Sequence, residues 1–289
     1  MTPRYEVEKK ERIGYQAWKS ALQKLTSSRS SNQLEELSAT DWDILIVLDA
    51  CRVDVLEGLA NWPVDSVVSP ASCTPEWIGE VSSSRVLSGS RVVSANPQYE
   101  KVDADLGCEE IEPYWETHWD DDLQTTVPEQ VLDRVSEISQ NSSGRVVGHL
   151  QQPHWPYIAK LGDRWLLAYD ELGPWNDDEE ITSLQVAMQR GLVDVEMAKK
   201  AYESSIHSVW NVLKTYLAEW VSDGNNVVVT ADHGETFGRY REFGFYEHPC
   251  RCHVAPLVRV PWIEVRADDG VTETSDTVGE RLQALGYAE

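Results

Sequence analysis

The sequence contains no long apolar run. No stretch approaches the roughly 18 consecutive apolar residues that a membrane-spanning helix requires. The first residues, MTPRYEVEKKERIG, also lack the apolar core of a signal peptide. Both absences predict a protein with no stable membrane span and a cytoplasmic location. The 289 residues, of which 41% are hydrophobic, are enough for the core of one large α/β domain or of two small ones.

Basic residues are scarce: 25 stand against 49 acidic ones, which gives a formal net charge of −24. Such a surface repels phosphate backbones and argues against a nucleic-acid partner. The acidic residues are scattered rather than gathered into a tail. This distribution suits a very salty cytoplasm, where screening shortens the range of self-repulsion to a few ångströms. We expect a halophilic protein that needs molar salt to fold; a full native circular dichroism spectrum in dilute buffer would contradict this.

Cysteine is also scarce, and its spacing excludes a disulfide scaffold. The five cysteines are an odd number without paired spacing. Together with the missing signal peptide, this predicts reduced thiols. Cys250 and Cys252 lie too close together for the usual ligand pair of a structural zinc site.

What the sequence does contain is a short apolar strand that ends in metal-ligating residues. Residues 227–230 predict a buried strand, and Asp232 and His233 follow at its carboxyl end, where open α/β sheets place their ligands. A carboxylate oxygen and a neutral imidazole nitrogen suit zinc or manganese. Gly234 then allows a sharp turn past the ion. The alternative is a polar turn in which Asp232 caps a helix and His233 is exposed.

A second apolar run ends in the same way and favours the metal site. Residues 42–52, WDILIVLDACR, predict a strand that stops at Asp49. Two buried strands that each bring an aspartate to one edge of a sheet can build a metal cage from distant parts of the sequence. Arg52 follows, either in an ion pair with Asp54 or as an anion clamp. The sequence leaves both interpretations open.

A hydroxyl residue starts the helix that follows the next expected strand. Thr74, Pro75 and Glu76 form a strong helix start, with the threonine at the N-cap and proline at the first helical position. Capping is one role for Thr74. The other role is nucleophilic, because the free amides and the positive dipole end of a helix favour a negatively charged oxygen.

The rest of the chain predicts helices that alternate with strands. The expected helices are one or two amphipathic helices in 5–38, broken near the serines of 27–31, and further helices at 128–140, 195–220 and 277–285. The expected strands are 64–68, 145–150 and 257–265. Residues 90–125 are expected to be an irregular surface excursion, and 160–192 an insertion. His149 and His154 lie near the end of the strand at 145–150.

Six segments, taken together and in this order, resemble the alkaline phosphatase superfamily, and most nearly its sulfatase-like hydrolases and transferases. They are ILIVLDACRVD, SPASCTPEW, HLQQPHWPY, VVVTADHGETFG, HPCRCHVAPLVRVPW and RLQALGY, and they span most of the chain from residue 42 onward. The resemblance implies an α/β fold: a three-layer αβα sandwich with a central, mostly parallel sheet and a divalent metal ion at its carboxyl edge. We divide the chain into an N-terminal helical arm, 1–40, and a single catalytic domain, 41–289, with insertions near 95–125 and 160–192.

The resemblance also implies roles for residues of this sequence. The ligands of one zinc, manganese or calcium ion would be Asp49, Thr74, Asp232 and His233. A second ion, the substrate or the leaving group would be served by His253, with His154 or His248. The first metal would lower the pKa of the nucleophile's hydroxyl, and the metal with arginine or histidine would stabilise the transferred group.

The sequence departs from the sulfatases at two motifs. Asp49 is followed by Ala50, where sulfatases carry a second aspartate. Cys73 stands where sulfatases have the cysteine that becomes formylglycine, but the serine and arginine of that motif are replaced. Thr74 is therefore the preferred nucleophile, and Cys73 is the alternative.

The resulting hypothesis is a metal-dependent hydrolase of phosphate or sulfate esters that uses Thr74, assisted by Arg52 and His253. One alternative is a transferase that moves a phosphoryl-linked group to a glycan or lipid, with the tryptophan-rich segments holding the acceptor. Another is a non-catalytic member that binds an anionic glycan. The sequence leaves the metal's identity and the oligomeric state open.

Overall fold

The strand that ends at Asp49 is the centre of the fold. The computed structural model describes residues 4–26, 30–60, 63–169, 183–239 and 242–267. In it, β1 (Ile44–Asp49) is buried over all 6 residues. It pairs in parallel with β5 (Val146–Pro153) on one side and with β8 (Val227–Ala231) on the other. The apolar sequences of β1 and β8 are those of strands covered on both faces.

Within the described residues, seven strands form the main sheet, in the order β2-β9-β8-β1-β5-β3-β4. The remaining strands of this sheet are β2 (Asp65–Val68), β3 (Arg91–Ser94), β4 (Glu110–Pro113) and β9 (Arg259–Val265). The strands from β8 to β4 run in parallel, whereas β9 is antiparallel to both β8 and β2. The sheet is therefore mostly parallel, as the resemblance implied.

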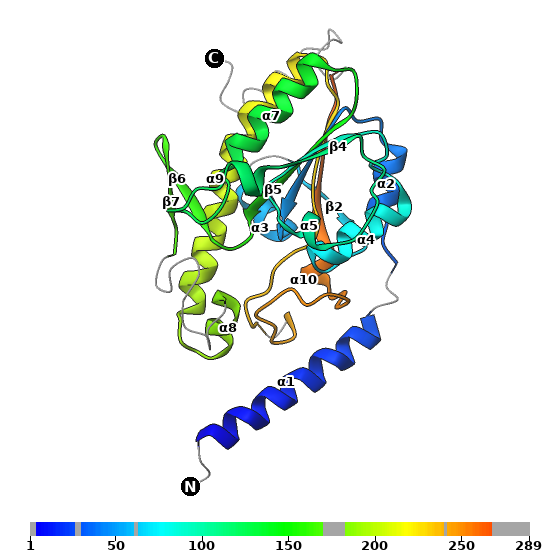
Figure 1. Ribbon diagram of the computed structural model, residues 1–289. Coiled ribbons are helices and arrows are strands. Elements are labelled where there is room, and N and C mark those ends of the chain that lie inside the picture. Colours follow the sequence, from blue (N-terminus) through cyan, green and yellow to red (C-terminus); the bar gives the residue numbers. More distant parts are fainter. Residues whose placement is uncertain (1–3, 27–29, 61–62, 170–182, 240–241, 268–289) are drawn as a thin grey trace.

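Helices cover both faces of this sheet (Figure 1). On one face, α7 (Pro128–Asn141) and the long α9 (Val195–Ser222) pack on β5, and α3 (Val53–Leu59) contacts α9 and β9. On the other face lie α2 (Gln33–Ala39) and α4 (Thr74–Ser84). This arrangement confirms the three-layer αβα sandwich.

The shorter elements connect these layers. They are α5 (Gln98–Lys101), α6 (Tyr114–Thr117), the antiparallel hairpin of β6 (Ile158–Leu161) and β7 (Arg164–Leu167), α8 (Leu184–Gln189) and α10 (Ala255–Val258).

The N-terminal helix α1 (Arg4–Thr26) does not lie on the sheet but beside the segment that follows β8 (Figure 1). Tyr15 and Lys19 both bond to the Glu247 carboxylate, at 3.1 and 2.8 Å, and Gln23 donates to the Cys250 carbonyl at 2.7 Å. Of the one or two helices expected in 5–38, two are present, α1 and α2. No helix in the described part of the chain combines the length and the apolarity needed to cross a membrane.

One expectation for the middle of the chain was wrong. Residues 90–125, expected to be irregular, contain β3 and β4, and β3 lies inside the sheet between β5 and β4. With only 4 residues, β3 is too short to show a period in the sequence. Residues 170–182, in the expected insertion, and the helix expected at 277–285 lie outside the described residues.

Candidate active site and metal centre

Three elements bring the candidate ligands to the carboxyl edge of the sheet. Asp49 is the last residue of β1, Asp232 and His233 directly follow β8, and Thr74 opens α4. The register pairs the penultimate residue of β1, Leu48, with the last residue of β8, so the two strands end side by side. The four side chains are buried, and the most exposed of them, Thr74, shows 4% of its surface. The structure thus brings together the residues that the sequence assigned to one ion.

The ligand atoms of these residues form a tight cluster. Thr74 Oγ1 lies 2.7 Å from Asp232 Oδ2, 3.5 Å from Asp49 Oδ1 and 3.3 Å from His233 Nε2. His233 Nε2 lies 3.4 Å from Asp49 Oδ1 and 3.6 Å from Asp232 Oδ2. Ligands at about 2.0–2.2 Å from a tetrahedral zinc ion are about 3.3–3.6 Å from one another. The residues present therefore fit a single divalent ion.

The imidazole of His233 is oriented as a metal ligand. Its Nδ1 atom lies 2.7 Å from the Gly234 carbonyl, which can only accept, so Nδ1 carries the proton and Nε2 is left free to face the carboxylates. Burial holds the pKa of His233 well below its usual value, so the ring is neutral. A Cβ atom at position 234 would lie 2.1 Å from the Pro256 carbonyl oxygen. This close approach, rather than a sharp turn past the ion, explains the glycine.

The carboxylates of the cluster repel each other. Burial and the charges of Asp232 and Glu235 raise the pKa of Asp49 well above its usual range. Buried carboxylates in contact are costly unless a cation or a proton compensates them. Ala50, with a left-handed φ of 60°, donates its N–H to Asp232 Oδ1 at 3.1 Å. An aspartate in place of Ala50 would add a further negative charge here. The charges of the cluster already favour a cation without it.

Asn96, which the sequence did not single out, also reaches the cluster. Its side chain is buried, and its Nδ2 atom donates to Asp49 Oδ2 at 2.6 Å and lies 3.5 Å from Thr74 Oγ1. Its own Oδ1 atom accepts from the Gln98 N–H at 2.9 Å, which fixes the side chain. By holding Oδ2, Asn96 turns Oδ1 of Asp49 toward the other ligands. The residue was missed because the strand before it, β3, was missed.

We expect Asn96→Ala to weaken metal binding about 10- to 100-fold, the usual effect of removing a group that orients a metal ligand. Calorimetric titration of the metal-free protein with Zn²⁺ or Mn²⁺ measures the change. The matched control is Asn141→Ala, which removes an amide at the exposed end of α7. An unchanged affinity in Asn96→Ala would show that Asp49 keeps its orientation without this amide.

Two buried polar atoms near the cluster have no hydrogen-bond partner among the described residues: His149 Nε2 and Gln151 Oε1. His149 Nε2 is 3.8 Å from Asp232 Oδ2, and the amide nitrogen of Gln151 is 3.5 Å from Asp49 Oδ2. Buried polar atoms without partners are rare in proteins. A group bound at this edge of the sheet would satisfy them.

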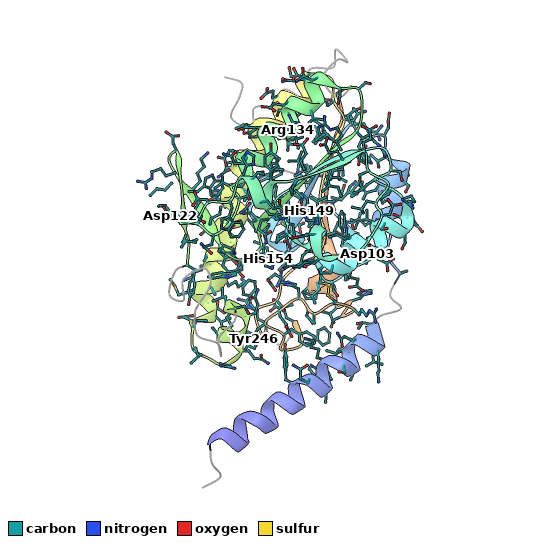
Figure 2. The ribbon with its side chains drawn as sticks, viewed as in Figure 1. Asp103, Asp122, Arg134, His149, His154 and Tyr246 are labelled. Carbon is teal, nitrogen blue, oxygen red and sulfur yellow. A yellow bond between two sulfur atoms is a disulfide. The ribbon has the colours of Figure 1, made fainter. Side chains whose placement is uncertain are left out.

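Of the three histidines proposed for a second site, two lie beside the Asp49–Asp232–His233 cluster. The ring of His248 is 4.5 Å from that of His233 and 5.0 Å from that of His154. Its Nδ1 atom lies 3.1 Å from Glu235, a residue of the D-H-G-E motif that was given no role. Burial opposes protonation of His248, but the Glu235 carboxylate outweighs it and raises the pKa of His248. Figure 2 shows His154 in the middle of the molecule, near His149.

The third histidine, His253, is not part of α4 but packs against the first turn of this helix. Its Nε2 atom is 3.0 Å from Glu76 Oε1. Glu76 also accepts the N–H groups of Ser72 and Arg251, at 3.0 and 2.9 Å. Burial raises the pKa of Glu76, but the bonds from His253 and the two amides outweigh it and lower the pKa to about 2. The pair fastens the segment around residue 251 to α4; a leaving-group role for His253 stays a prediction.

Glu76→Gln should lower the free energy of unfolding at neutral pH by about 1–2 kcal/mol, after allowance for solvent screening. The folded pKa of about 2 lies below the ordinary value of 4.5, so the contribution is complete above pH 4.5 and is lost as the pH falls through 2. Denaturant unfolding at neutral pH and at about pH 3 should therefore show a parent–variant difference that shrinks in acid. Glu80→Gln, on the exposed face of the same helix, is the control. Equal stability of parent and Glu76→Gln at neutral pH would refute the assignment.

Arg52 is buried and engaged by carboxylates. Its guanidinium lies 2.6 Å from Asp54 and also pairs with Glu242. It donates in addition to the Glu235 carbonyl at 3.3 Å. The ion pair with Asp54 that the sequence allowed is present, and the anion-clamp role stays a prediction.

The start of α4 differs from the prediction in two ways. The N-cap residue is Cys73 rather than Thr74, and the Thr74 hydroxyl donates to Asp232 instead of capping the helix. Cys73 forms a disulfide with Cys250, so the prediction of reduced thiols was wrong for this pair. The 177 residues between the two cysteines hid the pairing in the sequence. A sulfur in a disulfide is not available as a nucleophile, which removes Cys73 from that role while the bond is intact.

No protein-family model matches the chain, and no curated protein matches it significantly. Solved structures do. The periplasmic domain of phosphoethanolamine transferase EptC from Campylobacter jejuni is 16% identical, with a TM-score of 0.47 over 78% of this chain and 79% of that one. The Streptococcus pyogenes phosphoglycerol transferase GacH, solved with sn-glycerol-1-phosphate, is 10% identical, with a TM-score of 0.47 over 91% and 75%. BT1596, a 2-O GAG sulfatase, is 13% identical, with a TM-score of 0.44 over 85% and 70%.

Two of these neighbours are transferases, and the third is a sulfatase. A likeness at these identities concerns the fold alone, so the chemistry of this protein depends on the geometry of its own site.

Proposed function

We propose that the protein is a metal-dependent enzyme that cleaves phosphate or sulfate esters with Thr74 as its nucleophile. The supporting observation is the position of one hydroxyl: Thr74 Oγ1 lies 2.7 Å from Asp232 Oδ2 and 3.3 Å from His233 Nε2. A threonine kept only as a helix cap would bond to a backbone N–H; within the described residues, the Thr74 hydroxyl contacts side chains instead.

Thr74 attacks the phosphorus or sulfur atom of the substrate. Its hydroxyl is oriented by Asp232 Oδ2, which is also the nearest acceptor for its proton. The substrate's ester oxygen leaves, and water or an acceptor hydroxyl then releases the group from Thr74. A divalent ion held by Asp49, Thr74, Asp232 and His233 would lower the pKa of the hydroxyl and draw negative charge from the transferred group.

Hydrogen-bond donors surround the hydroxyl and can bind the oxygens of the transferred group. The Asn96 amide nitrogen lies 3.5 Å from Thr74 Oγ1. The first N–H groups of α4 have no partner within the helix, and a helix N-terminus favours anionic oxygens. We assign His248, which lies next to His233, and His154, which lies next to His248, to the substrate or to its leaving group.

A transferase is the second candidate, and a hollow beside the site favours it. The hollow has a volume of about 570 Å³ and is lined by Pro97, Trp115, Glu116, Trp119 and Asp121. Pro97 directly follows Asn96, whose amide nitrogen lies 3.5 Å from Thr74 Oγ1. Indole rings offer large apolar faces beside polar groups and suit the binding of a sugar or lipid acceptor. In this case a glycan or lipid hydroxyl, and not water, takes the group from Thr74.

A substrate panel tests the proposal. Aryl phosphates, aryl phosphodiesters and aryl sulfates are each supplied at high salt with zinc, manganese or calcium. Metal-dependent release of the aryl alcohol supports ester cleavage, and transfer to added glycerol or glycan in preference to water identifies a transferase. A protein that binds about one ion per chain yet turns over none of these esters would overturn the proposal. Glycan binding with neither metal nor turnover would favour the non-catalytic alternative.

A further inference from the structure

A covalent bond joins the helix that carries the nucleophile to the segment that carries His248. Cys73 immediately precedes Thr74, and Cys250 lies two residues after His248; their sulfur atoms form the disulfide. We propose that this bond is a redox switch, whose reduction releases residues 247–253 and lowers the activity of the site. The effect on activity rests on the proposed function, and the release of the segment does not.

The two sulfurs differ in a way that makes the bond reducible. Cys250 is exposed, whereas Cys73 is only 2% exposed and is the N-cap residue of α4. A thiolate from solvent therefore attacks Cys250 Sγ, and Cys73 is the leaving group. The bond is therefore open to attack on the Cys250 side and closed on the Cys73 side.

A small dithiol is the class of reductant that completes the reaction. Its first thiolate forms a mixed disulfide with Cys250, and the electron pair of the broken S–S bond goes to Cys73. Its second thiol then displaces Cys250 and closes the reductant's own disulfide. Two electrons and two protons pass from the dithiol to the protein, which gains two thiols.

The turn after Cys250 is held in a conformation that its residues do not prefer. Arg251 has a φ of 62°, in the left-handed region that a non-glycine residue rarely adopts. Ser72 Oγ donates to the Pro249 carbonyl at 2.9 Å and accepts from the Cys252 N–H at 3.0 Å. The Arg251 N–H donates to Glu76 at 2.9 Å. Once the disulfide is cut, only non-covalent contacts, such as these hydrogen bonds and the His253–Glu76 pair, hold the strained turn, and the turn can relax.

Relaxation of this turn reaches the metal cluster through His248. The Nδ1 atom of His248 is 3.1 Å from Glu235, and its ring is 4.5 Å from that of His233. Movement of this ring disturbs the side of the cluster where we place the substrate or its leaving group. This disturbance lowers turnover.

Hydrogen exchange and turnover of the full chain, measured before and after treatment with dithiothreitol in excess Mn²⁺, test the switch. Thiol labelling verifies that two further thiols appear. We expect the Arg251 and Cys252 amides to exchange at least about tenfold faster after reduction, kcat/KM to fall by a similar factor, and both to recover on reoxidation. Cys250→Ser should show the reduced-state values with and without dithiothreitol. Cys108→Ser, at a half-buried cysteine outside the disulfide, should behave as the parent.

Three results would overturn the switch. Unchanged exchange in the fully reduced parent would show that the segment is not released. Faster exchange with unchanged kcat/KM would show that the segment does not govern the site. An equal loss of activity on adding dithiothreitol to Cys250→Ser would assign the loss to metal removal. A parent that is inactive in both states would count against the proposed function alone, and the exchange rates would still decide whether the segment is released.

Discussion

Thr74→Ala should lower kcat/KM by about 10³-fold or more, the scale of loss when a covalent nucleophile is removed. Among the described residues, no other hydroxyl donates to Asp232 Oδ2, so none can take the place of Thr74. Thr74→Ser keeps the hydroxyl and should stay within about tenfold of the parent. Steady-state rates on the best ester of the panel, measured with saturating metal, give both values.

A matched control separates this chemical loss from a folding defect. Ser83→Ala removes an exposed hydroxyl from the same helix and should leave kcat/KM unchanged. Thr74→Ala should also cost about 1–2 kcal/mol of unfolding free energy, because Asp232 loses a buried donor and not because a cap is lost. Substantial activity in Thr74→Ala, or a trapped covalent adduct on a peptide without Thr74, would assign the attack to another group.

Asp232→Asn should abolish metal binding and activity while stabilising the metal-free protein. The parent should hold about one ion per chain and the variant almost none, because a neutral amide replaces the central anionic ligand. Without metal, Asp232 is one cause of the raised pKa of Asp49. Removal of its charge relieves that repulsion, so the melting temperature of the metal-free variant should exceed that of the metal-free parent.

Thermal unfolding with and without metal measures both parts of this prediction. The parent should gain stability as metal is added, in proportion to the logarithm of the metal concentration above the dissociation constant, whereas Asp232→Asn should not respond. His233→Ala should also lose the response, without the gain in the metal-free state. Asp122→Asn changes an exposed carboxylate at the periphery (Figure 2) and should match the parent. An Asp232→Asn protein with the parent's metal content would end the assignment of this cluster as a metal centre.

The sequence predicted the cluster's ligands because their positions follow from a simple physical pattern. Asp49 and Asp232 each end an apolar run, and apolar runs of that length become buried parallel strands whose carboxyl ends meet at one edge. Thr74 stands at a helix start marked by Pro75. Asp49, Asp232 and His233 can therefore be found from local sequence, whereas the resemblance was needed to add Thr74 to the proposed ligand set.

Other parts of the site depend on contacts that local sequence does not carry. Asn96 is placed by β3, which is 4 residues long and is a strand only because β4 and β5 flank it. The partner of Cys73 lies 177 residues away. The capping role that local sequence allowed for Thr74 is absent for the same reason, because the carboxylate that its hydroxyl contacts directly follows β8. Pairing between distant segments decides all three cases.

The place of β1 in the sheet governs when the site can form as the chain leaves the ribosome. Ile44 pairs with Val146 on one side and with Val227 on the other, so one edge of this apolar strand lacks its partner until most of the chain has been made. An open apolar edge is a template for association with other chains. Asp49 and Thr74 emerge well before Asp232 and His233, so the cluster cannot form until all four residues have been made. A metal ion could therefore bind to this cluster, and β1 could be covered on both edges, only after residues 227–233 have been made.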